Sequence, residues 1–442
     1  MKAVLSSRLR RTSLALGLAL LLVLPCATRA QDTEQYELPP INYSHTAPHD
    51  VITTLQADIK SGKLPLTGNA REVVTRLLQE LRIPVTSQIL VFSRTSFQND
   101  RISPTHPRSL YFTDDCYIGW VPGGLMEVAA IDPVLGPVFY SFDPRGQGAE
   151  KPFEFQRGND CLRCHGGQFV SGIPSVFVRT VYASESGDPI FRQGTEVVDY
   201  RTPFTQRWGG WYVTGTHGKT LHRGNTFAAE SGDQLLFNPA PGANLTNLAT
   251  FFDASDYLTN SSDIVALLVY EHQTAMQNAL TRAGLNCRHM LDYQQHLQQE
   301  LKEPANDSEP QYDSVRGMFD HSAEEVLDAL LFKDEATLPD TIRGTTDFQT
   351  TFAAAAPRVP GAGSLKDLLV SDHLFQNRCS YLIYSESFRR LPPALKQRIY
   401  TRLAKALDPE KPDRRYDYIH RSERQRISAI LRATLPEFAS VR

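Results

Sequence analysis

The sequence lacks long apolar runs, and the one extended run, over residues 14–24, lies near its start. A helix that crosses a bilayer takes about 20 apolar residues, so this run is too short for a stable membrane span. Basic residues precede it, namely Lys2, Arg8, Arg10 and Arg11. Thr28-Arg29-Ala30 then offers a small-residue cleavage site before Gln31. This is the layout of a signal peptide over residues 1–30, and we expect a periplasmic or secreted protein with no stable membrane span.

The sequence also lacks an excess of basic residues. The whole chain has 46 Lys and Arg against 49 Asp and Glu. Five basic residues and no acidic ones lie in residues 1–30, which leaves 41 against 49 and a net charge of −8 after cleavage. A nucleic-acid partner selects a basic surface, so we expect no nucleic-acid binding. An acidic chain instead favours a basic protein partner.

Cysteine is scarce, with six residues in 442, and Cys26 falls within the predicted signal peptide. Cys116, Cys287 and Cys379 are isolated in the sequence. In an oxidising compartment they can form one disulfide in any of three pairings, with one thiol left over. All three can equally be small buried apolar residues, and the sequence leaves these alternatives open.

The other two cysteines form the clearest motif of the chain, Cys161-Leu162-Arg163-Cys164-His165. A structural zinc site takes four ligands, and the chain has no second Cys-x-x-Cys pair to complete one. A thioredoxin-like redox pair lies between a strand and a helix, whereas two glycines follow this motif directly.

Attachment of a c-type haem uses every fixed residue of the motif. The two thiols bond to the porphyrin, and the adjacent histidine ligates the iron. The predicted export agrees with it, because this attachment takes place outside the cytoplasm. We therefore expect one covalent haem c, bound by Cys161, Cys164 and His165, with His165 as the proximal metal ligand.

A second axial ligand separates an electron carrier from a protein that activates small molecules. His217 is the first candidate, since glycines in "RWGGWYVTGTHG" permit close backbone approach and aromatic neighbours can pack on a porphyrin edge. His222 is a second candidate. His272 and Met276 lie one turn apart on an apolar helix face, where such residues more often belong to the core.

An open or water-bound iron is the remaining alternative. Arg207 or Arg223 would then assist oxygen–oxygen cleavage, although either arginine can also bind haem propionates.

The patterns along the chain predict an α+β fold with a strand-rich N-terminal half and a helical C-terminal half. Two helices are expected over residues 50–82, the first ending at Gly62. Short aromatic and β-branched segments predict strands over 87–93, 109–113, 116–121, 136–142 and 173–183. We place a mixed haem-binding region at 31–260 and a mainly helical region at 261–442.

The helical region begins with the most strongly periodic segment of the chain. Ser262 or Asp263 can cap its start, and Gly284 is expected to end it. Polar linkers follow at 303–311 and 356–364, and further helices are expected after Pro393 and over 422–433.

Several stretches resemble large exported bacterial proteins with a single c-type haem motif, known as cytochrome c domain-containing proteins. They are "SQILVFSRTSFQ", "PRSLYF", "GWVPGG", "CLRCH", "RWGGWYVTGTHG", "EHQTAMQN" and "CSYLIYSESF", spread over most of residues 40–435. The resemblance implies covalent haem and a redox function, and it names no substrate. The chain departs from it at Gln277, where a histidine is expected, which weakens a metal role for that helix.

The expected function is electron transfer to or from a redox partner protein. The alternatives are a haem enzyme with an exchangeable distal site, peroxidase-like or oxygenase-like, and a haem-bearing interaction module. An electron carrier needs about 100 residues around its haem. The far greater length of this chain therefore predicts an additional pocket, docking surface or sensor role.

Overall fold

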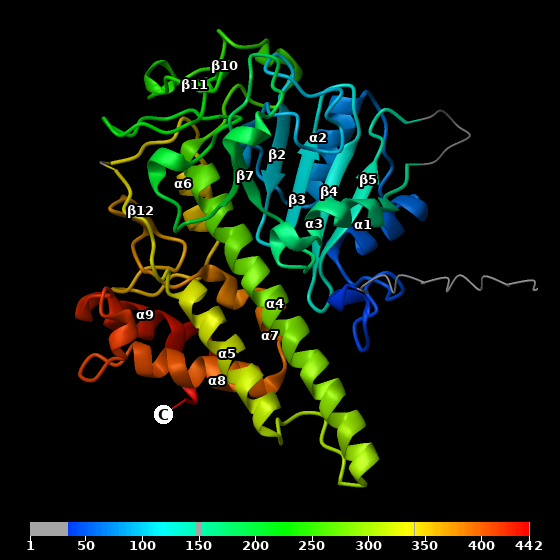
Figure 1. Ribbon diagram of the computed structural model, residues 1–442, viewed down its shortest axis with the longest axis vertical. Coiled ribbons are helices and arrows are strands. Elements are labelled where there is room, and N and C mark those ends of the chain that lie inside the picture. Colours follow the sequence, from blue (N-terminus) through cyan, green and yellow to red (C-terminus); the bar gives the residue numbers. More distant parts are fainter. Residues whose placement is uncertain (1–33, 147–152, 340, 442) are drawn as a thin grey trace, which may run out of the picture. The chain divides into compact units, whose positions relative to one another are not determined.

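The computed structural model describes residues 34–146, 153–339 and 341–441. The predicted signal peptide lies outside these residues. Glu34–Arg442 form one compact unit, so the predicted boundary at residue 260 marks a change of secondary structure inside that unit. The α+β class is confirmed, with an antiparallel sheet in the N-terminal half and helices in the C-terminal half (Figure 1).

The helices and strands are numbered in the order in which they occur in the sequence. The helices are α1 Val51–Lys60, α2 Ala70–Glu80, α3 Leu162–His165, α4 Ile264–Leu301, α5 Asp313–Leu330, α6 Phe348–Ala354, α7 Glu386–Arg389, α8 Pro393–Ala406, α9 Arg421–Thr434 and α10 Pro436–Ala439. The strands are β1 Ile89–Val91, β2 Arg108–Phe112, β3 Cys116–Trp120, β4 Met126–Asp132, β5 Gly136–Phe142, β6 Gln156–Arg157, β7 Val178–Val181, β8 Thr195–Val198, β9 Trp211–Tyr212, β10 Ala229–Ser231, β11 Gln234–Leu236, β12 Leu368–Ser371 and β13 His373–Phe375.

The main sheet has the strand order β6-β5-β4-β3-β2-β1-β9, and its neighbouring strands run antiparallel. Strands β1, β2, β3, β5 and β7 occupy the predicted segments. Strand β4, in contrast, was not predicted. Its sequence MEVAAID carries a charge at Glu127 and two alanines, which hide the aromatic and β-branched signal of the other strands. That charge is retained because Glu127 forms an ion pair with Arg108 across the sheet.

Helices and the Cys161–His165 segment cover the two faces of the sheet. On one face, the Tyr140 hydroxyl donates to Asp50, the N-cap of α1, at 2.7 Å. On the other face, Gln273 of α4 donates to the Tyr117 hydroxyl at 2.9 Å. The His165 ring packs on Phe139 of that same second face, at 4.8 Å between ring centroids. The motif and α4 therefore share one side of the sheet.

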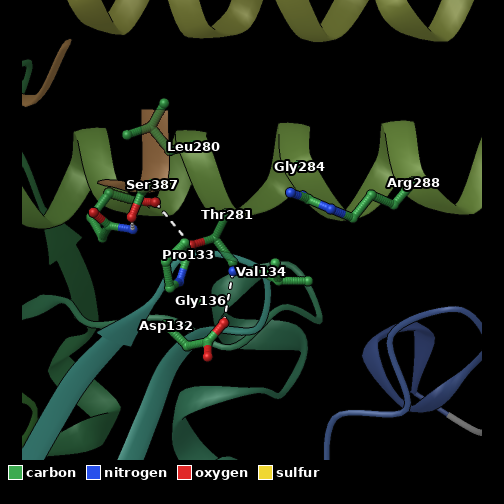
Figure 2. Close-up of a pocket in the computed structure, with 10 residues that line it drawn as sticks. Asp132, Pro133, Val134, Gly136, Leu280, Thr281, Gly284, Arg288 and Ser387 are labelled. Atoms are coloured by element: carbon green, nitrogen blue, oxygen red, sulfur yellow. Dashed lines mark hydrogen bonds between the residues drawn. The ribbon is translucent and has the colours of Figure 1, made fainter. Parts of the chain in front are cut away.

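Helix α4 begins at the predicted cap, Asp263, whose carboxylate accepts hydrogen bonds from the next turn. The predicted end at Gly284 is wrong, since α4 continues over 38 residues to Leu301. A Cβ at Gly284 would lie 2.7 Å from the guanidinium of Arg288, one turn further along the helix. Beside it, a small hollow lined by Asp132, Thr281 and Ser387 lies between α4 and the turn that joins β4 to β5 (Figure 2).

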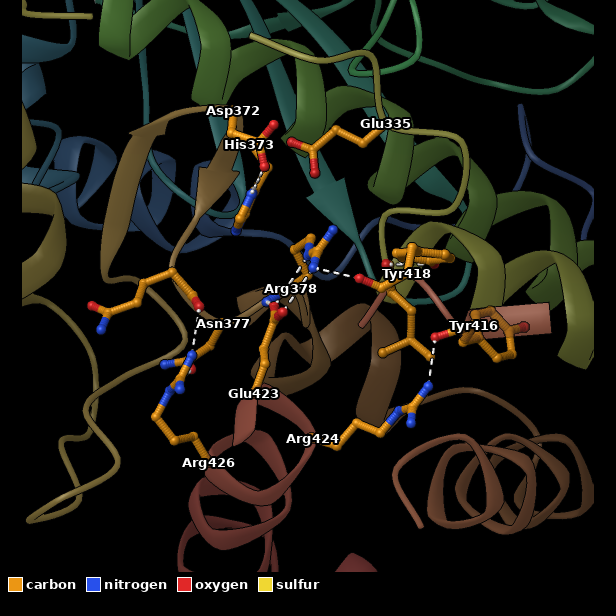
Figure 3. A network of polar contacts seen from close by, with 12 residues as sticks. Glu335, Asp372, His373, Asn377, Arg378, Tyr416, Tyr418, Glu423, Arg424 and Arg426 are labelled. Carbon is orange, nitrogen blue, oxygen red and sulfur yellow. Dashed lines mark hydrogen bonds and ion pairs between the residues drawn. The ribbon is translucent and has the colours of Figure 1, made fainter. Parts of the chain in front are cut away.

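The C-terminal half is a helical assembly in which α5 packs on both α4 and α8. A polar network ties its loops to α9 (Figure 3). The Arg378 guanidinium binds the Glu423 carboxylate at 2.8 Å, and the Arg378 backbone N–H donates to the same carboxylate at 2.7 Å. Glu335 lies above this pair with one carboxylate oxygen buried and without a hydrogen bond. Among the helices of the described ranges, none combines the length and the apolar character that a membrane crossing requires.

Candidate functional site

The two motif cysteines lie on one short helical stretch. A 3-10 turn over Asn159–Cys161 leads directly into α3, and Cys161 itself has helical backbone angles. Residues three apart on a helix share a face, which places both thiols on one side of the turn. Both are free, with Cys161 half-buried and Cys164 exposed. The buried side chain of Leu162 anchors the turn in the core.

His165 is held by a residue ten positions later. Its ring Nδ1 lies 2.9 Å from the carbonyl oxygen of Ser175. The backbone N–H of Ser175 donates in return to the His165 carbonyl at 2.8 Å. A carbonyl only accepts, so Nδ1 carries the proton and Nε2 carries the lone pair. No hydrogen bond to Nε2 occurs within the part of the chain that the structure describes, which leaves this nitrogen available to a metal.

Two phenyl rings fix the plane of the imidazole. Phe139 lies on one side at 4.8 Å, and Phe177 lies at 5.0 Å between ring centroids. Burial lowers the pKa of His165, which favours the neutral ring that metal binding requires. The arrangement is a neutral, oriented imidazole next to two free thiols.

His217, the first candidate for the second axial ligand, has both ring nitrogens engaged. Nδ1 lies 2.8 Å from the Thr220 carbonyl oxygen, and Nε2 accepts from the Asn244 backbone N–H at 3.1 Å. The ring is fully buried and lies 4.7 Å from the ring of His222. For His217 to ligate a metal, at least one of these two bonds must break.

His222 shares this cluster, where its Nδ1 accepts from the Gly224 backbone N–H at 3.0 Å. Burial lowers the pKa of His222 to about 3, so the ring is neutral. The Phe204 ring packs on both histidines, and the Trp208 ring packs on His222 and Phe204. The structure thus places His217 and His222 side by side in one cluster.

The α4 candidates lie in the core of the C-terminal half. His272 Nε2 lies 2.8 Å from the Ser380 hydroxyl, and its ring stacks on Phe332 at 4.0 Å. Burial lowers the pKa of His272 to about 3, and Met276 is fully buried. No hydrogen bond or ring contact within the described ranges joins His272 or either of the other two candidate histidines to His165.

The two arginines singled out in the sequence have different environments. Arg207 is buried, and its guanidinium binds Glu271 at 2.7 Å together with the carbonyl oxygens of Thr202 and Tyr200. Arg223 lies over the Tyr182 ring and 4.0 Å from Glu196. The bonds of Arg207 give it a structural role.

The three isolated cysteines are free thiols, and each is buried. Burial raises the pKa of both Cys287 and Cys379 to about 12. Buried thiols of this kind are inert and pack as small apolar residues. The structure therefore favours the packing alternative over a disulfide.

Sequence reasoning did not find the partners that orient His165. Ser175 acts through its backbone carbonyl, which carries no sequence signal. Phe139 and Phe177 lie in predicted strand segments. Their contact with His165 arises only because the segment that carries the motif folds back onto the sheet. Arg108 and Glu127, the ion pair on the same sheet face, were also missed.

The described residues contain no group of three or more His, Cys, Asp and Glu side chains that would hold a metal ion. A c-type haem requires no such group, because one imidazole and two thiols suffice. The chain matches no family model, and no curated protein or solved structure matches it. The functional assignment therefore rests on the geometry at His165.

Proposed function

We propose that this protein is an exported c-type cytochrome that carries one haem c on Cys161, Cys164 and His165 and acts in electron transfer. The observation that carries the proposal is the state of the His165 ring, whose Nδ1 is bonded to a carbonyl while Nε2 has no partner within the described residues. A hydrogen bond from Nδ1–H to a carbonyl is the usual support of a metal-ligating histidine.

The residues of the motif fit a covalent haem in their spacing and chemistry. The thiols are free and lie three residues apart on one helical turn. Gly166, which follows the histidine, lies where a Cβ would be 2.9 Å from the Tyr36 hydroxyl. A larger residue at this position would require the Tyr36 side chain to shift.

When bound, the haem iron supplies a one-electron redox couple. His165 would ligate it through Nε2, and the Ser175 carbonyl would keep Nδ1 protonated and raise the basicity of the ligand. Cys164 is exposed, so one point of attachment lies at the surface. An electron donor or acceptor can approach such a point without a channel.

The partner and the location belong to the same proposal. The net charge of −8 after removal of residues 1–30 supports a basic redox partner protein. The predicted signal peptide supports the periplasm or the cell exterior, which is also where this haem attachment takes place.

A second candidate function is a haem enzyme whose distal position exchanges ligands. The observation that favours it is the engagement of both ring nitrogens of His217 by Thr220 and Asn244. With His217 held in this way, a haem on His165 would have its distal position free for water or a small molecule unless another side chain ligated it. Rapid cyanide binding by the ferric protein would favour this candidate over a six-coordinate carrier.

The decisive experiment is expression with the haem-attachment machinery, followed by acid–organic extraction and mass measurement of the chain. The wild type is expected to retain its pigment and to gain the mass of one haem. The Cys161→Ser/Cys164→Ser variant is expected to lose both, whereas Cys379→Ala, which removes a buried thiol outside the motif, keeps them. A colourless wild type, or pigment that resists extraction from the double variant, would overturn the proposal.

A further inference from the structure

An ion pair lies on the sheet face that carries the haem motif. Arg108 of β2 and Glu127 of β4 meet at 2.5 Å, and each side chain is only 18% exposed. Gly119 of β3 lies between them, opposite Glu127 in the strand register. A Cβ on Gly119 would lie 2.2 Å from the Arg108 guanidinium. The glycine therefore provides the space in which Arg108 lies across the sheet.

The strand register places this pair next to the proximal histidine. Phe139, which packs on His165, lies opposite Ala129, and Glu127 lies two residues before Ala129 on β4. Residues two apart on a strand share a face, and such diagonal neighbours are about 7–8 Å apart.

The hydrogen bonds of Arg108 are incomplete. Its Nε is buried and has no partner. Glu127, in contrast, also accepts from the Gln98 amide at 3.2 Å. A buried charged donor without an acceptor is costly, and a carboxylate or a water molecule brought to this position would satisfy it. Arg157 and Arg424 each have a similarly unpartnered Nε. The terminal nitrogens of Arg157, however, hold the backbone of Thr46 and Tyr43, and Arg424 donates to the Tyr416 carbonyl.

We infer that Arg108 binds a carboxylate of the cofactor, namely a haem propionate. Glu127 is the positioning residue that orients Arg108, and Gly119 leaves the space in which the Arg108 and Glu127 side chains meet. This inference rests on the proposed function, because the carboxylate comes from the haem that His165 would ligate. Guanidinium groups bind carboxylates through paired N–H donors, and Arg108 combines an unpartnered donor with a place beside the ligand. In this proposal Arg108 is the propionate-binding residue, in place of the earlier candidates Arg207 and Arg223.

The test uses the holoprotein and pairs of neutral substitutions. Arg108→Gln/Glu127→Gln removes the pair without changing the net charge. Arg223→Gln/Glu196→Gln is the matched control, because Arg223 is 19% exposed and also has one carboxylate neighbour. The midpoint potential of each protein is measured across acidic and neutral pH, and haem attachment is checked by mass.

The Arg108→Gln/Glu127→Gln protein is expected to keep its covalent haem. Its potential is expected to fall, and the pH-dependent break in the potential to rise by about one to three pH units, because a propionate without its guanidinium ionises less readily. The control is expected to match the wild type. A purely structural ion pair predicts the wild-type profile in both double variants, and that result would overturn the inference while leaving the proposed function intact.

Arg108→Lys provides a second test should the double variant fail to fold. Lysine keeps the charge and loses the planar fork, so a smaller shift in the same direction is expected. A profile identical to that of the wild type would contradict the inference. A wild type without covalent haem would overturn both the inference and the proposed function, so the two failures are distinguishable.

Discussion

The ring Nδ1 of His165 lies 2.9 Å from the carbonyl oxygen of Ser175. The Ser175 backbone N–H donates back to the His165 carbonyl at 2.8 Å, so the two residues hold each other through both main chain and side chain. This reciprocal arrangement fixes the tautomer and restricts rotation of the ring. It makes the orientation of the proposed iron ligand depend on the segment that carries Ser175.

That segment is held in turn by Asn278 of α4. The Asn278 amide accepts from the Val176 N–H at 3.1 Å and donates to the Val176 carbonyl at 2.7 Å. Asn278→Ala should therefore loosen the neighbouring Ser175 carbonyl and weaken its bond to His165. A weaker bond lowers the basicity of the ligand, so we expect a higher midpoint potential and an altered ferric EPR spectrum.

Gln294→Ala is the matched control for this prediction. Gln294 also lies on α4 and also holds backbone groups, at Asn306, Glu309 and Gln311. Both substitutions should lower the free energy of unfolding by about 1–3 kcal/mol, and only Asn278→Ala should change the potential. Equal potentials in the two variants would show that α4 does not position the ligand.

His217→Ala tests whether this imidazole is the second axial ligand. Removal of the imidazole leaves the Asn244 N–H and the Thr220 carbonyl without their partner, so the free energy of unfolding should fall by about 1–3 kcal/mol. The absorption spectrum and spin state of the holoprotein should stay as in the wild type. The exposed residue His106 supplies the control, since His106→Ala should change neither quantity. A change from low spin to high spin would restore His217 as the second axial ligand.

Much of the fold was predictable because strand and helix signals are local. The aromatic and β-branched segments mark β2, β3 and β5 to within one residue at each end. Gly62, with a φ of +75°, follows α1 where a helix end was expected. The predicted end of α4 at Gly284 was wrong because a glycine inside a long helix gives the same local signal as a glycine that ends one.

The candidate site likewise has a part that was predictable from the sequence and a part that was not. Cys161, Cys164 and His165 are adjacent in sequence, and their spacing alone predicts the chemistry. The partners of His165 and His217 are contributed by separate segments, such as Phe139 on β5 and Asn244 in a loop. No periodicity links such residues, so the second axial ligand was predicted from the neighbouring glycines and aromatic residues, without knowledge of the hydrogen bonds that the ring already makes.

Glu335 gives the free energy of unfolding a predictable pH dependence. Burial raises the pKa of Glu335 from 4.5 to about 7, and one carboxylate oxygen has no hydrogen-bond partner. The folded protein therefore binds this proton more tightly than the unfolded chain does. Its contribution to the free energy of unfolding is fully present below pH 4.5 and is lost as the pH rises to about 7.

Glu335→Gln should remove this decrease in the free energy of unfolding at higher pH. Above neutral pH the variant should be more stable than the wild type by about 1–3 kcal/mol, and urea unfolding in acidic and alkaline buffer measures the difference. Glu300→Gln, at an exposed position, controls for the change in net charge. A variant that is less stable than the wild type at every pH would indicate that the Glu335 carboxylate is ionised and paired.

Asp263 is predicted to be the position outside the site at which substitution lowers the free energy of unfolding most, because its carboxylate binds two segments of the chain. Its carboxylate accepts from Val265 and Ala266 at the start of α4. The second oxygen accepts from the backbone N–H groups of Thr345 and Thr346, each at 2.8 Å. An isolated helix cap contributes about 0.5–2 kcal/mol, and each further buried donor left unsatisfied costs about 1–3 kcal/mol.

Asp263→Ala should therefore lower the free energy of unfolding by at least about 3 kcal/mol. Asp253→Ala, which removes the cap of a single exposed 3-10 turn, should cost less than about 1 kcal/mol. Because α4 also carries Asn278, amide exchange at Val176 and Ser175 should quicken in Asp263→Ala and stay unchanged in Asp253→Ala. Faster exchange confined to residues 264–270 would show that the start of α4 opens without disturbing the segment that holds His165.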